Sequence, residues 1–325
     1  MPIPLLRFPF VVLNEIIKTM GFQQLFPLSL CSKTMHLVVK NLRDKSIEFK
    51  LRLEGQDGTV RIYLSEKKKK KVFGLRVSAM PEGILEGWTV DKYRGVVFHE
   101  DRDLVRSYWE DVEVGTRRLL EHVCDLFSAH VETVLFCNDL TWILDLVEQR
   151  QGPRSYEAYC KYIEPTHDQL RHWLVDLNPT SLHLCGEPSE QFRIENFHKK
   201  YDTLEVWSEN WISGDNLLTL DCRRLITHYT TFTVTEINRF LRHVLIEGGA
   251  PRLTEFRSRV NNAGADRILD GIRGVLEPIP GKEQFEDGVL TWQFSGLLDR
   301  GDRSVVVSII CDKHLLNFFD FRIEQ

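Results

Sequence analysis

The sequence predicts an α+β protein in which a module of three short helices is followed by an array of alternating strands and helices that includes β-hairpins. Three observations predict this fold class. Apolar residues recur at helical spacing up to residue 45, they alternate with polar residues in the stretch that follows, and beyond residue 117 short strand patterns alternate with helical ones. With 325 residues, the chain can form two units, or one small unit and a long array.

The composition favours a folded protein that binds neither nucleic acid nor membrane. Hydrophobic residues make up 42% of the chain and charged residues 27%, which is typical of globular rather than disordered proteins. The formal net charge is -5, so the chain lacks the basic field that supplies most non-specific affinity for DNA or RNA. No stretch reaches the ~18 uninterrupted apolar residues that a membrane-spanning helix needs.

The cysteines indicate a reducing compartment. There are 7 of them, an odd number without any C-x-x-C pair, which is unlike a disulfide framework or a closed zinc site. We therefore expect a cytoplasmic or nuclear protein, or both, with no metal and no cofactor. The alternative for the apolar stretch at 3–17 is a secretory signal, but Arg7, Asn14 and Glu15 interrupt it and no A-x-A-like cleavage site follows.

The N-terminal module contains three apolar stripes at helical spacing, near residues 12–17, 22–30 and 35–42. Gly21 is expected to end the first helix in a left-handed conformation, and Ser32 is expected to cap the third. Because Pro27 lacks an amide hydrogen, the second helix is expected to begin just before it. A unit this small buries too little surface to be stable alone, so it needs a neighbour.

Two runs in this module carry a family resemblance. Residues 8–17 read F-P-F-V-V-L-N-E-I-I, and residues 25–35 read L-F-P-L-S-L-C-S-K-T-M. They resemble the F-box, although Val11 replaces the usual acidic residue and Met35 the usual aromatic one. The resemblance implies binding to a small adaptor protein that joins a receptor to a cullin scaffold. The positions that match, and are the implied adaptor contacts, are Pro9, Leu13, Ile16, Leu25, Leu28, Leu30 and Lys33.

The stretch at 46–116 is expected to be rich in β-strands. Apolar residues alternate with polar ones over 47–53 and 60–64, and Asp57 and Gly58 between them favour a tight turn, which predicts a β-hairpin. A third strand is expected at 72–77. The five lysines at 67–71 read as a solvated loop, with a nuclear address or a phosphate-binding patch as the alternative.

From residue 117 to 325 a degenerate repeat is expected. Strand patterns occur near 131–136, 182–184, 201–206, 222–227 and from 253, and helical stretches occur at 140–149, 167–177, 215–220 and 235–246. The spacing of roughly 20 to 30 residues resembles a leucine-rich-repeat array, whose strands line a concave binding surface. The expected domains are therefore 1–45, 46–116 and 117–325.

A second resemblance lies inside this array. Residues 211–225 read W-I-S-G-D-N-L-L-T-L-D-C-R-R-L, residues 235–244 read T-E-I-N-R-F-L-R-H-V, and residues 248–253 read G-G-A-P-R-L. They are similar to the F-box-associated domain, type 2, of a large family of nematode F-box proteins, although Val244 replaces an expected tryptophan. Together the two resemblances imply a non-enzymatic substrate-recognition subunit of a cullin-RING (SCF-type) ubiquitin ligase, whose F-box binds the adaptor and whose C-terminal domain binds an unidentified substrate protein.

Strand alternation predicts where the substrate would bind. If Leu182 and Leu204 point into the core, their neighbours point to the opposite face. The alternative for Trp207 is a core position covered by the C-terminal hairpins. The expected substrate-binding stripe consists of His183, Glu205, Trp207, Ile226, His228, Arg257 and Arg259.

No catalytic motif is complete, since the chain has no phosphate-binding loop, no G-x-S-x-G elbow and no H-E-x-x-H. Two other functions stay open: a scaffold whose N-terminal helices merely cap the array, and an enzyme with a less obvious site. A cap would bury its whole apolar stripe, whereas an F-box would leave part of the stripe exposed. An enzyme would have a deep pocket with converging ionisable groups.

Overall fold

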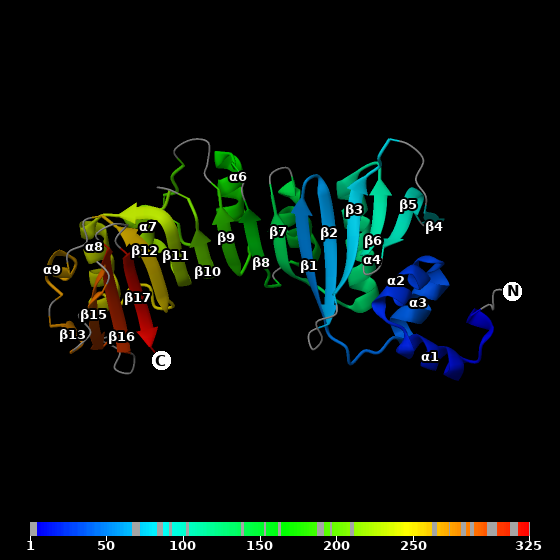
Figure 1. The fold of residues 1–325 in the computed structure, drawn as a ribbon, viewed down its shortest axis with the longest axis horizontal. Helices are drawn as coiled ribbons and strands as arrows, with labels where there is room; N and C mark the ends of the chain where they lie inside the picture. Colours follow the sequence, from blue (N-terminus) through cyan, green and yellow to red (C-terminus); the bar gives the residue numbers. More distant parts are fainter. Residues whose placement is uncertain are drawn as a thin grey trace. The chain divides into compact units, whose positions relative to one another are not determined.

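The computed structural model divides the chain into two compact units, residues 1–156 and 157–325. Both mix helices with strands, and Figure 1 shows them in chain order from blue to red. The structure describes residues 5–66, 72–82, 87–90, 93–101, 104–137, 140–152, 154–161, 164–186, 192–195, 197–208, 211–261, 265–272, 274–280, 284–286, 289–297, 304–312 and 318–324. The lysine run at 67–71 lies outside these residues.

The first unit begins with the predicted helical module. A short 3-10 turn, Leu5–Arg7, precedes three α-helices: α1 (Phe10–Thr19), α2 (Phe22–Leu30) and α3 (Lys33–Leu42). The Ser32 hydroxyl accepts a hydrogen bond from the Met35 amide, which confirms the predicted cap of α3.

Two local predictions in the module were wrong. Gly21 is not left-handed: its φ is -81°, and it forms the N-cap of α2, where its amide donates to the Gln24 side chain. Because this cap fixes the start of α2 at Phe22, Pro27 lies inside the helix rather than in its first turn. Burial of Phe26 and Leu30 on either side of the proline offsets the lost backbone bond.

The sheet of the first unit has the order β4-β5-β6-β3-β2-β1-β7. Pairs β6–β3 and β1–β7 are parallel, and the other pairs are antiparallel. Its strands are β1 (Phe49–Gln56), β2 (Thr59–Glu66), β3 (Val72–Ala79), β4 (Trp88–Val90), β5 (Tyr93–Asp101), β6 (Leu104–Trp109) and β7 (Val131–Phe136).

The predicted β1–β2 hairpin is confirmed, with Gln56 opposite Thr59. The two turn residues, Asp57 and Gly58, have positive φ values of 50° and 64°, as a tight hairpin turn requires. Helix α4 (Val112–Phe127) packs on β2, β3 and β6, and α5 (Trp142–Gln151) packs on β7. Since β7 pairs with β1, the predicted boundary at residue 116 lies inside this unit.

The second unit opens with parallel strands β8 (Glu157–Lys161), β9 (Ser181–Cys185), β10 (Lys200–Val206), β11 (Asp221–Phe232) and β12 (Glu255–Val260). Their register aligns one buried row across the sheet: Ala158, Leu182, Leu204, Leu225 and Phe256. Capping boxes at Thr166, Ser213 and Thr233 start α6 (His167–Arg171), α7 (Gly214–Thr219) and α8 (Val234–Leu245).

Antiparallel strands extend this sheet beyond β12, in the order β12-β17-β16-β15, and β13 and β14 both pair with β15. Helix α9 (Ala265–Ile268) precedes these strands in the chain. The strands are β13 (Leu276–Pro278), β14 (Gln284–Glu286), β15 (Val289–Leu297), β16 (Ser304–Asp312) and β17 (Phe318–Glu324).

One face of this sheet carries the core. The Phe240 ring of α8 lies 4.7 Å from that of Phe256 and 5.9 Å from that of Phe321, and the Tyr201 hydroxyl donates to the Leu174 carbonyl in the π-helical turn His172–Asp176 that follows α6. Side chains that alternate with these buried residues lie on the opposite face, which we call the outer face of the C-terminal sheet.

Candidate functional site

The N-terminal module has an exposed apolar surface. Along the 3-10 turn and the first turn of α1, four large apolar side chains are open to solvent, and Phe10 and Val11 are 68% and 71% exposed. Single exposed apolar residues are ordinary, but consecutive ones on a helix mark an interaction surface. This N-terminal apolar patch consists of Leu6, Phe10, Val11 and Val12.

The predicted adaptor contacts divide into two groups. Leu13, Leu25 and Leu30 are buried inside the module at 6%, 5% and 1% exposure, so their side chains hold the three helices together. The others reach the surface to different degrees: Ile16 and Leu28 are half-buried, whereas Pro9 and Lys33 are exposed. Sequence reasoning missed the patch itself, because the F-box resemblance points to consensus positions and Phe10 to Val12 lie between them.

Aromatic packing anchors the opposite side of the module to its unit. The rings of Phe22, Phe49 and Phe127 contact one another at centroid distances of 4.6 to 5.9 Å. The guanidinium of Arg43 lies against two of these rings, and its Nε donates to the Leu126 carbonyl over 2.8 Å. Burial lowers the pKa of Arg43. These contacts fix α2 and α3 and leave the outer side of α1 free.

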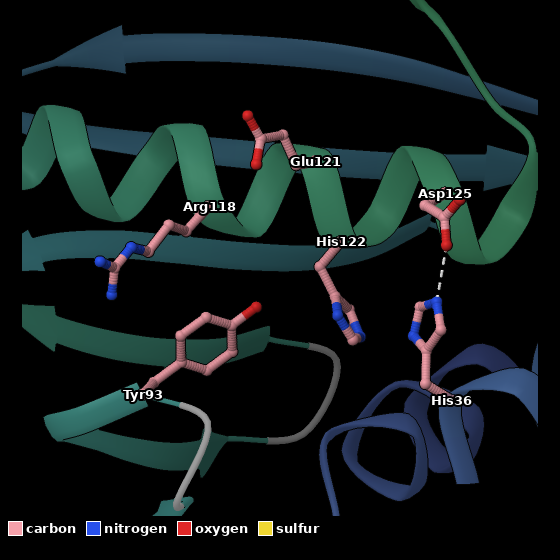
Figure 2. Close-up of a pocket in the computed structure, with 6 residues that line it drawn as sticks. All are labelled: His36, Tyr93, Arg118, Glu121, His122 and Asp125. Atoms are coloured by element: carbon pink, nitrogen blue, oxygen red, sulfur yellow. Dashed lines mark hydrogen bonds and ion pairs between the residues drawn. The ribbon is translucent and has the colours of Figure 1, made fainter. Parts of the chain in front are cut away.

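A polar cavity lies beside this anchor, between α3, α4 and β5. Its volume is about 420 Å³, and Figure 2 shows the side chains that line it: His36, Tyr93, Arg118, Glu121, His122 and Asp125. Asp125 accepts hydrogen bonds from His36 at 2.7 Å and from Lys40 at 2.5 Å. The bond from Lys40 is the main cause of the lowered pKa of Asp125.

Behind the cavity wall, His122 forms with Ser29 the pair of groups that comes nearest to a catalytic arrangement. The Ser29 hydroxyl lies 2.7 Å from His122 Nε2, and the His122 ring packs against that of His36 at 4.6 Å. However, Ser29 is only 1% exposed and its hydroxyl also donates to the Phe26 carbonyl, so no substrate can reach it. Burial raises the pKa of Tyr93 to about 12, which keeps its phenol neutral. The cluster joins the module to α4 rather than forming a nucleophilic site.

On the outer face of the C-terminal sheet, Glu205 lies at the centre of a hydrogen-bonded network. His183 Nδ1 donates to its Oε2 and His228 Nε2 to its Oε1, both over 2.7 Å, and Trp207 Nε1 donates to Oε1 over 3.1 Å. The hydrogen bond from His183 is the largest cause that lowers the pKa of Glu205 to about 2; burial opposes it and His228 assists it. The charge of Glu205 is thus already stabilised within the sheet.

Aromatic rings stack on both histidines of this network. Tyr159 lies parallel to His183 with a centroid distance of 4.1 Å, and Trp207 lies parallel to His228 at 3.4 Å. Trp207 is 37% exposed, so it is not a core residue. The stacking leaves one broad ring surface open to solvent beside a polar network, an arrangement that suits a protein partner.

The register places the predicted stripe across neighbouring strands. His183, Glu205, Ile226 and Arg257 are successive partners from β9 to β12, with Trp207 and His228 at the adjacent level and Arg259 one alternate position along β12. Ile226 occupies the row but is only 8% exposed, so it supports its neighbours rather than offering a contact. Whether the stripe binds a substrate stays a prediction.

Sequence reasoning missed several described members of this face, among them Tyr159, Phe318 and Asp320. Tyr159 alternates with the buried Ala158 and Cys160 in β8, and recognising that strand would have found it. Asp320 and Phe318 lie opposite Arg257 and Arg259 in β17, and no local pattern predicts that pairing because β17 follows β12 only after a long separation in sequence.

No group of histidine, cysteine and acidic side chains that could hold a metal ion occurs among the described residues. Nor does the described part of the chain contain a helix long and apolar enough to span a membrane.

No match to a curated protein or to a solved structure was found. Two family models do match: residues 5–47 fit the F-box domain, and residues 192–258 fit a model described as F-box associated. The resemblance predicted from the sequence is therefore confirmed, and the chain carries an F-box domain followed by an F-box-associated domain.

Proposed function

We propose that this chain is the substrate-recognition subunit of an SCF-type cullin-RING ubiquitin ligase. The presence of both domains indicates such a role in general. Its F-box binds a small adaptor protein, which links it to a cullin scaffold, and its C-terminal unit binds a substrate protein. Under this proposal the chain acts in the cytoplasm, the nucleus or both, as a subunit of the ligase.

The exposure of the N-terminal apolar patch is the observation that carries this proposal. Phe10 and Val11 are more than two-thirds exposed, although the module that holds them is well packed through Leu13 and Phe26. A helical cap that merely ended the sheet would bury such side chains, since their burial is its source of stability. The patch therefore favours a module that binds a separate partner over the scaffold alternative.

The mechanism is proximity. A receptor that holds a substrate close to a conjugating enzyme raises the effective concentration of the reacting groups and needs no catalytic residue of its own. The sealed Ser29–His122 pair fits this role, because its hydroxyl holds α2 to α4 and is closed to substrates. Families with these two domains are adaptor-type and non-catalytic, which agrees with a receptor.

The outer face of the C-terminal sheet is the proposed substrate-binding surface. Parallel strands β8 to β12, joined through helices on the other face, support a leucine-rich-repeat-like array for this part of the chain. Within it, residues 192–258 of the F-box-associated match include Glu205, Trp207 and His228. We keep the three domains 1–45, 46–116 and 117–325 as the proposed functional division.

Adaptor capture by surface variants tests the proposal. The double variant Phe10→Asp with Val11→Asp should weaken binding of a purified SCF adaptor by about thirtyfold or more, as expected when an interface hot spot is lost. Val114→Asp is the matched control, because Val114 is an exposed apolar residue of the same unit that lies outside the patch. Its binding should match that of the unaltered protein.

Circular dichroism and thermal melts should show that both variants fold, since the replaced side chains are exposed. If the unaltered protein fails to bind the adaptor, the proposed function is wrong. If the unaltered protein binds but the double variant binds undiminished, the assignment of the patch as the adaptor contact is wrong. Failure of the control variant alone would locate the adaptor on α4 and refute the assignment of the patch.

A further inference from the structure

Four arginines lie on the described outer face of the C-terminal sheet, and they differ in their partners. Arg224 contacts Glu255 at 2.7 Å, Arg257 contacts Glu255 at 3.3 Å and Asp320 at 3.5 Å, and Arg322 contacts Asp320 at 2.8 Å. Arg259 has no carboxylate partner in the part of the chain that the structure describes.

Arg259 rests on an aromatic ring instead. Its guanidinium carbon lies 4.7 Å from the centroid of Tyr229, and its Nε is buried without a hydrogen-bond acceptor. A cation–π contact stabilises the charge from one side but accepts none of the guanidinium hydrogens. The described residues thus leave the buried Nε of Arg259 without a hydrogen-bond acceptor.

Exposed aromatic side chains lie near this cation on the same face. Tyr229, Trp207 and Phe318 are 40%, 37% and 36% exposed. The Trp207 and Tyr229 rings meet edge to face at 6.2 Å, and Phe318 lies directly opposite Arg259 in the β12–β17 register. We call this group, consisting of Trp207, Tyr229, Arg259 and Phe318, the Arg259 patch.

The nearest acidic network does not supply the missing partner. Glu205 accepts hydrogen bonds from two histidines and from Trp207, so its oxygens are engaged. Glu255 and Asp320 are shared among the other three arginines. The local excess of charge at the Arg259 patch is therefore positive, and a complementary ligand is negative.

We propose that the Arg259 patch binds an acidic segment of the substrate protein: a carboxylate of Asp or Glu pairs with Arg259, and an adjacent apolar side chain packs on Trp207 and Tyr229. This inference rests on the proposed function and names the class of substrate. Tryptophan, tyrosine and arginine are the residues most enriched among interface hot spots.

The charge balance favours a carboxylate over a phosphorylated side chain. A phosphate group carries nearly two negative charges and is typically bound where several arginines gather. Here three of the four arginines are already paired, which leaves Arg259 as the one arginine of the described face for the ligand. One guanidinium matches one carboxylate in both charge and bidentate geometry.

Binding of defined peptide pools to the full-length protein tests this proposal. Three pools of fluorescent dodecapeptides have random flanks and a fixed central pair, which is Leu-Asp, Leu-Asn or Leu-phosphoserine. We expect the Leu-Asp pool to bind about tenfold or more tightly than the Leu-Asn pool, as for a hydrogen bond to a charged group. Fluorescence anisotropy provides the measurement.

Two variants and a control assign the effect to the patch. Arg259→Gln should abolish the preference for Leu-Asp, and Trp207→Ala should weaken binding of the Leu-Asp pool by about thirtyfold. Arg224→Gln removes an arginine of the same face that is already paired and should retain the preference. Thermal melts establish that each variant is folded.

Each remaining outcome is informative. Equal binding of the Leu-Asp and Leu-Asn pools, or a preference that survives Arg259→Gln, would overturn the inference, and tightest binding of the phosphoserine pool would replace the carboxylate with a phosphate. Adaptor capture by the same protein preparation separates this failure from failure of the proposed function. A protein that binds the adaptor but shows no peptide preference refutes only the inference.

Discussion

The N-terminal apolar patch and the outer face of the C-terminal sheet are both exposed, yet they offer different chemistry. The patch presents Phe10 and Val11 without polar partners, whereas the outer face presents Trp207 within a network in which Glu205 accepts three hydrogen bonds. An apolar patch binds through burial alone and tolerates sequence change that keeps its hydrophobicity. A polar network constrains geometry, so it discriminates among partners more strongly.

The comparison fits a receptor with one constant partner and one selected partner. A shared adaptor requires the same contact from many receptors, and in our proposal the exposed Phe10 and Val11 would provide it on binding. A substrate requires discrimination, and in our proposal Arg259 provides the selecting charge, whereas Arg224, Arg257 and Arg322 are already paired with carboxylates. The following changes test this distinction, from the largest expected effect on stability to the smallest.

Leu13→Asp should destabilise the first unit by at least about 3 kcal/mol. Leu13 is 6% exposed, and truncating such a side chain to alanine already costs about 2 to 5 kcal/mol before a charge is buried. The matched change Phe10→Asp, one helical turn earlier on α1, should alter stability by less than about 0.5 kcal/mol because Phe10 is exposed. Urea denaturation followed by circular dichroism measures both.

Equal stability of these two variants would show that α1 does not separate a buried side from an exposed one. It would also remove the distinction between residues that hold the module together and residues proposed to bind the adaptor. Adaptor capture by Leu13→Asp alone cannot identify a contact, since loss of the fold abolishes it too.

Ser29→Ala should lower the free energy of unfolding by about 1 to 3 kcal/mol, as expected when a buried polar group loses a hydrogen-bond partner. The variant removes the hydroxyl 2.7 Å from His122 Nε2 at a site where both residues are almost fully buried. Thr34→Ala, at an exposed position of the same module, is the control and should leave the melting temperature nearly unchanged. Thermal melts measure the difference, and an unchanged melting temperature in Ser29→Ala would mean that this pair does not hold the module to α4.

Glu205→Gln should lower stability near neutral pH by about 1 kcal/mol, after allowance for the partial exposure of the network. The pKa of Glu205 is lowered from 4.5 to about 2, so the folded chain keeps this carboxylate ionised where the unfolded chain would protonate it. Its contribution is therefore fully present above the unfolded value and is lost as pH falls toward the folded value.

Chemical denaturation of both proteins from about pH 7 downward measures this dependence. The difference in free energy of unfolding between the unaltered protein and Glu205→Gln should stay constant down to about pH 5 and then shrink to zero. If the histidines do not stabilise the charge of Glu205, this difference in free energy should not depend on pH. That result would contradict the proposed stabilisation of Glu205 by His183 and His228. Asp202→Asn is a useful control, because Asp202 lies on the same strand outside the network and pairs with Arg252.

The sequence predicted those parts of the fold that local patterns specify. The β1–β2 hairpin follows from alternation and from Asp57 and Gly58, and Ser32 caps α3 as expected from its position before an apolar stripe. Gly21 and Pro27 were assigned wrongly because the side chain of Gln24, which caps α2 by accepting from the Gly21 amide, fixes where the helix starts. Tertiary packing then outweighs the local preference of proline.

The candidate sites were predictable only in part, for a similar reason. Alternation within single strands was enough to place His183, Glu205 and His228 on one face. The contributions of Tyr159, Phe318 and Asp320 depend on which strands pair, and pairing between distant strands leaves no local signal. Likewise, the family resemblance named Leu13 and Leu25, whereas exposure identifies Phe10 and Val11.

Arg224→Gln should have the smallest effect on stability, less than about 1 kcal/mol. Its contact with Glu255 is 2.7 Å long, the same distance as that between Ser29 and His122, but the Arg224 side chain is 49% exposed. Water and salt screen an exposed ion pair, and Glu255 keeps Arg257 as a partner after the change. Thermal melts at low and high salt should therefore barely separate Arg224→Gln from the unaltered protein, whereas Ser29→Ala should differ at both. If Arg224→Gln proved as damaging as Ser29→Ala, the ion pairs of the outer face would stabilise the sheet as strongly as the buried Ser29–His122 pair stabilises the first unit, and the expected screening by water and salt would be wrong.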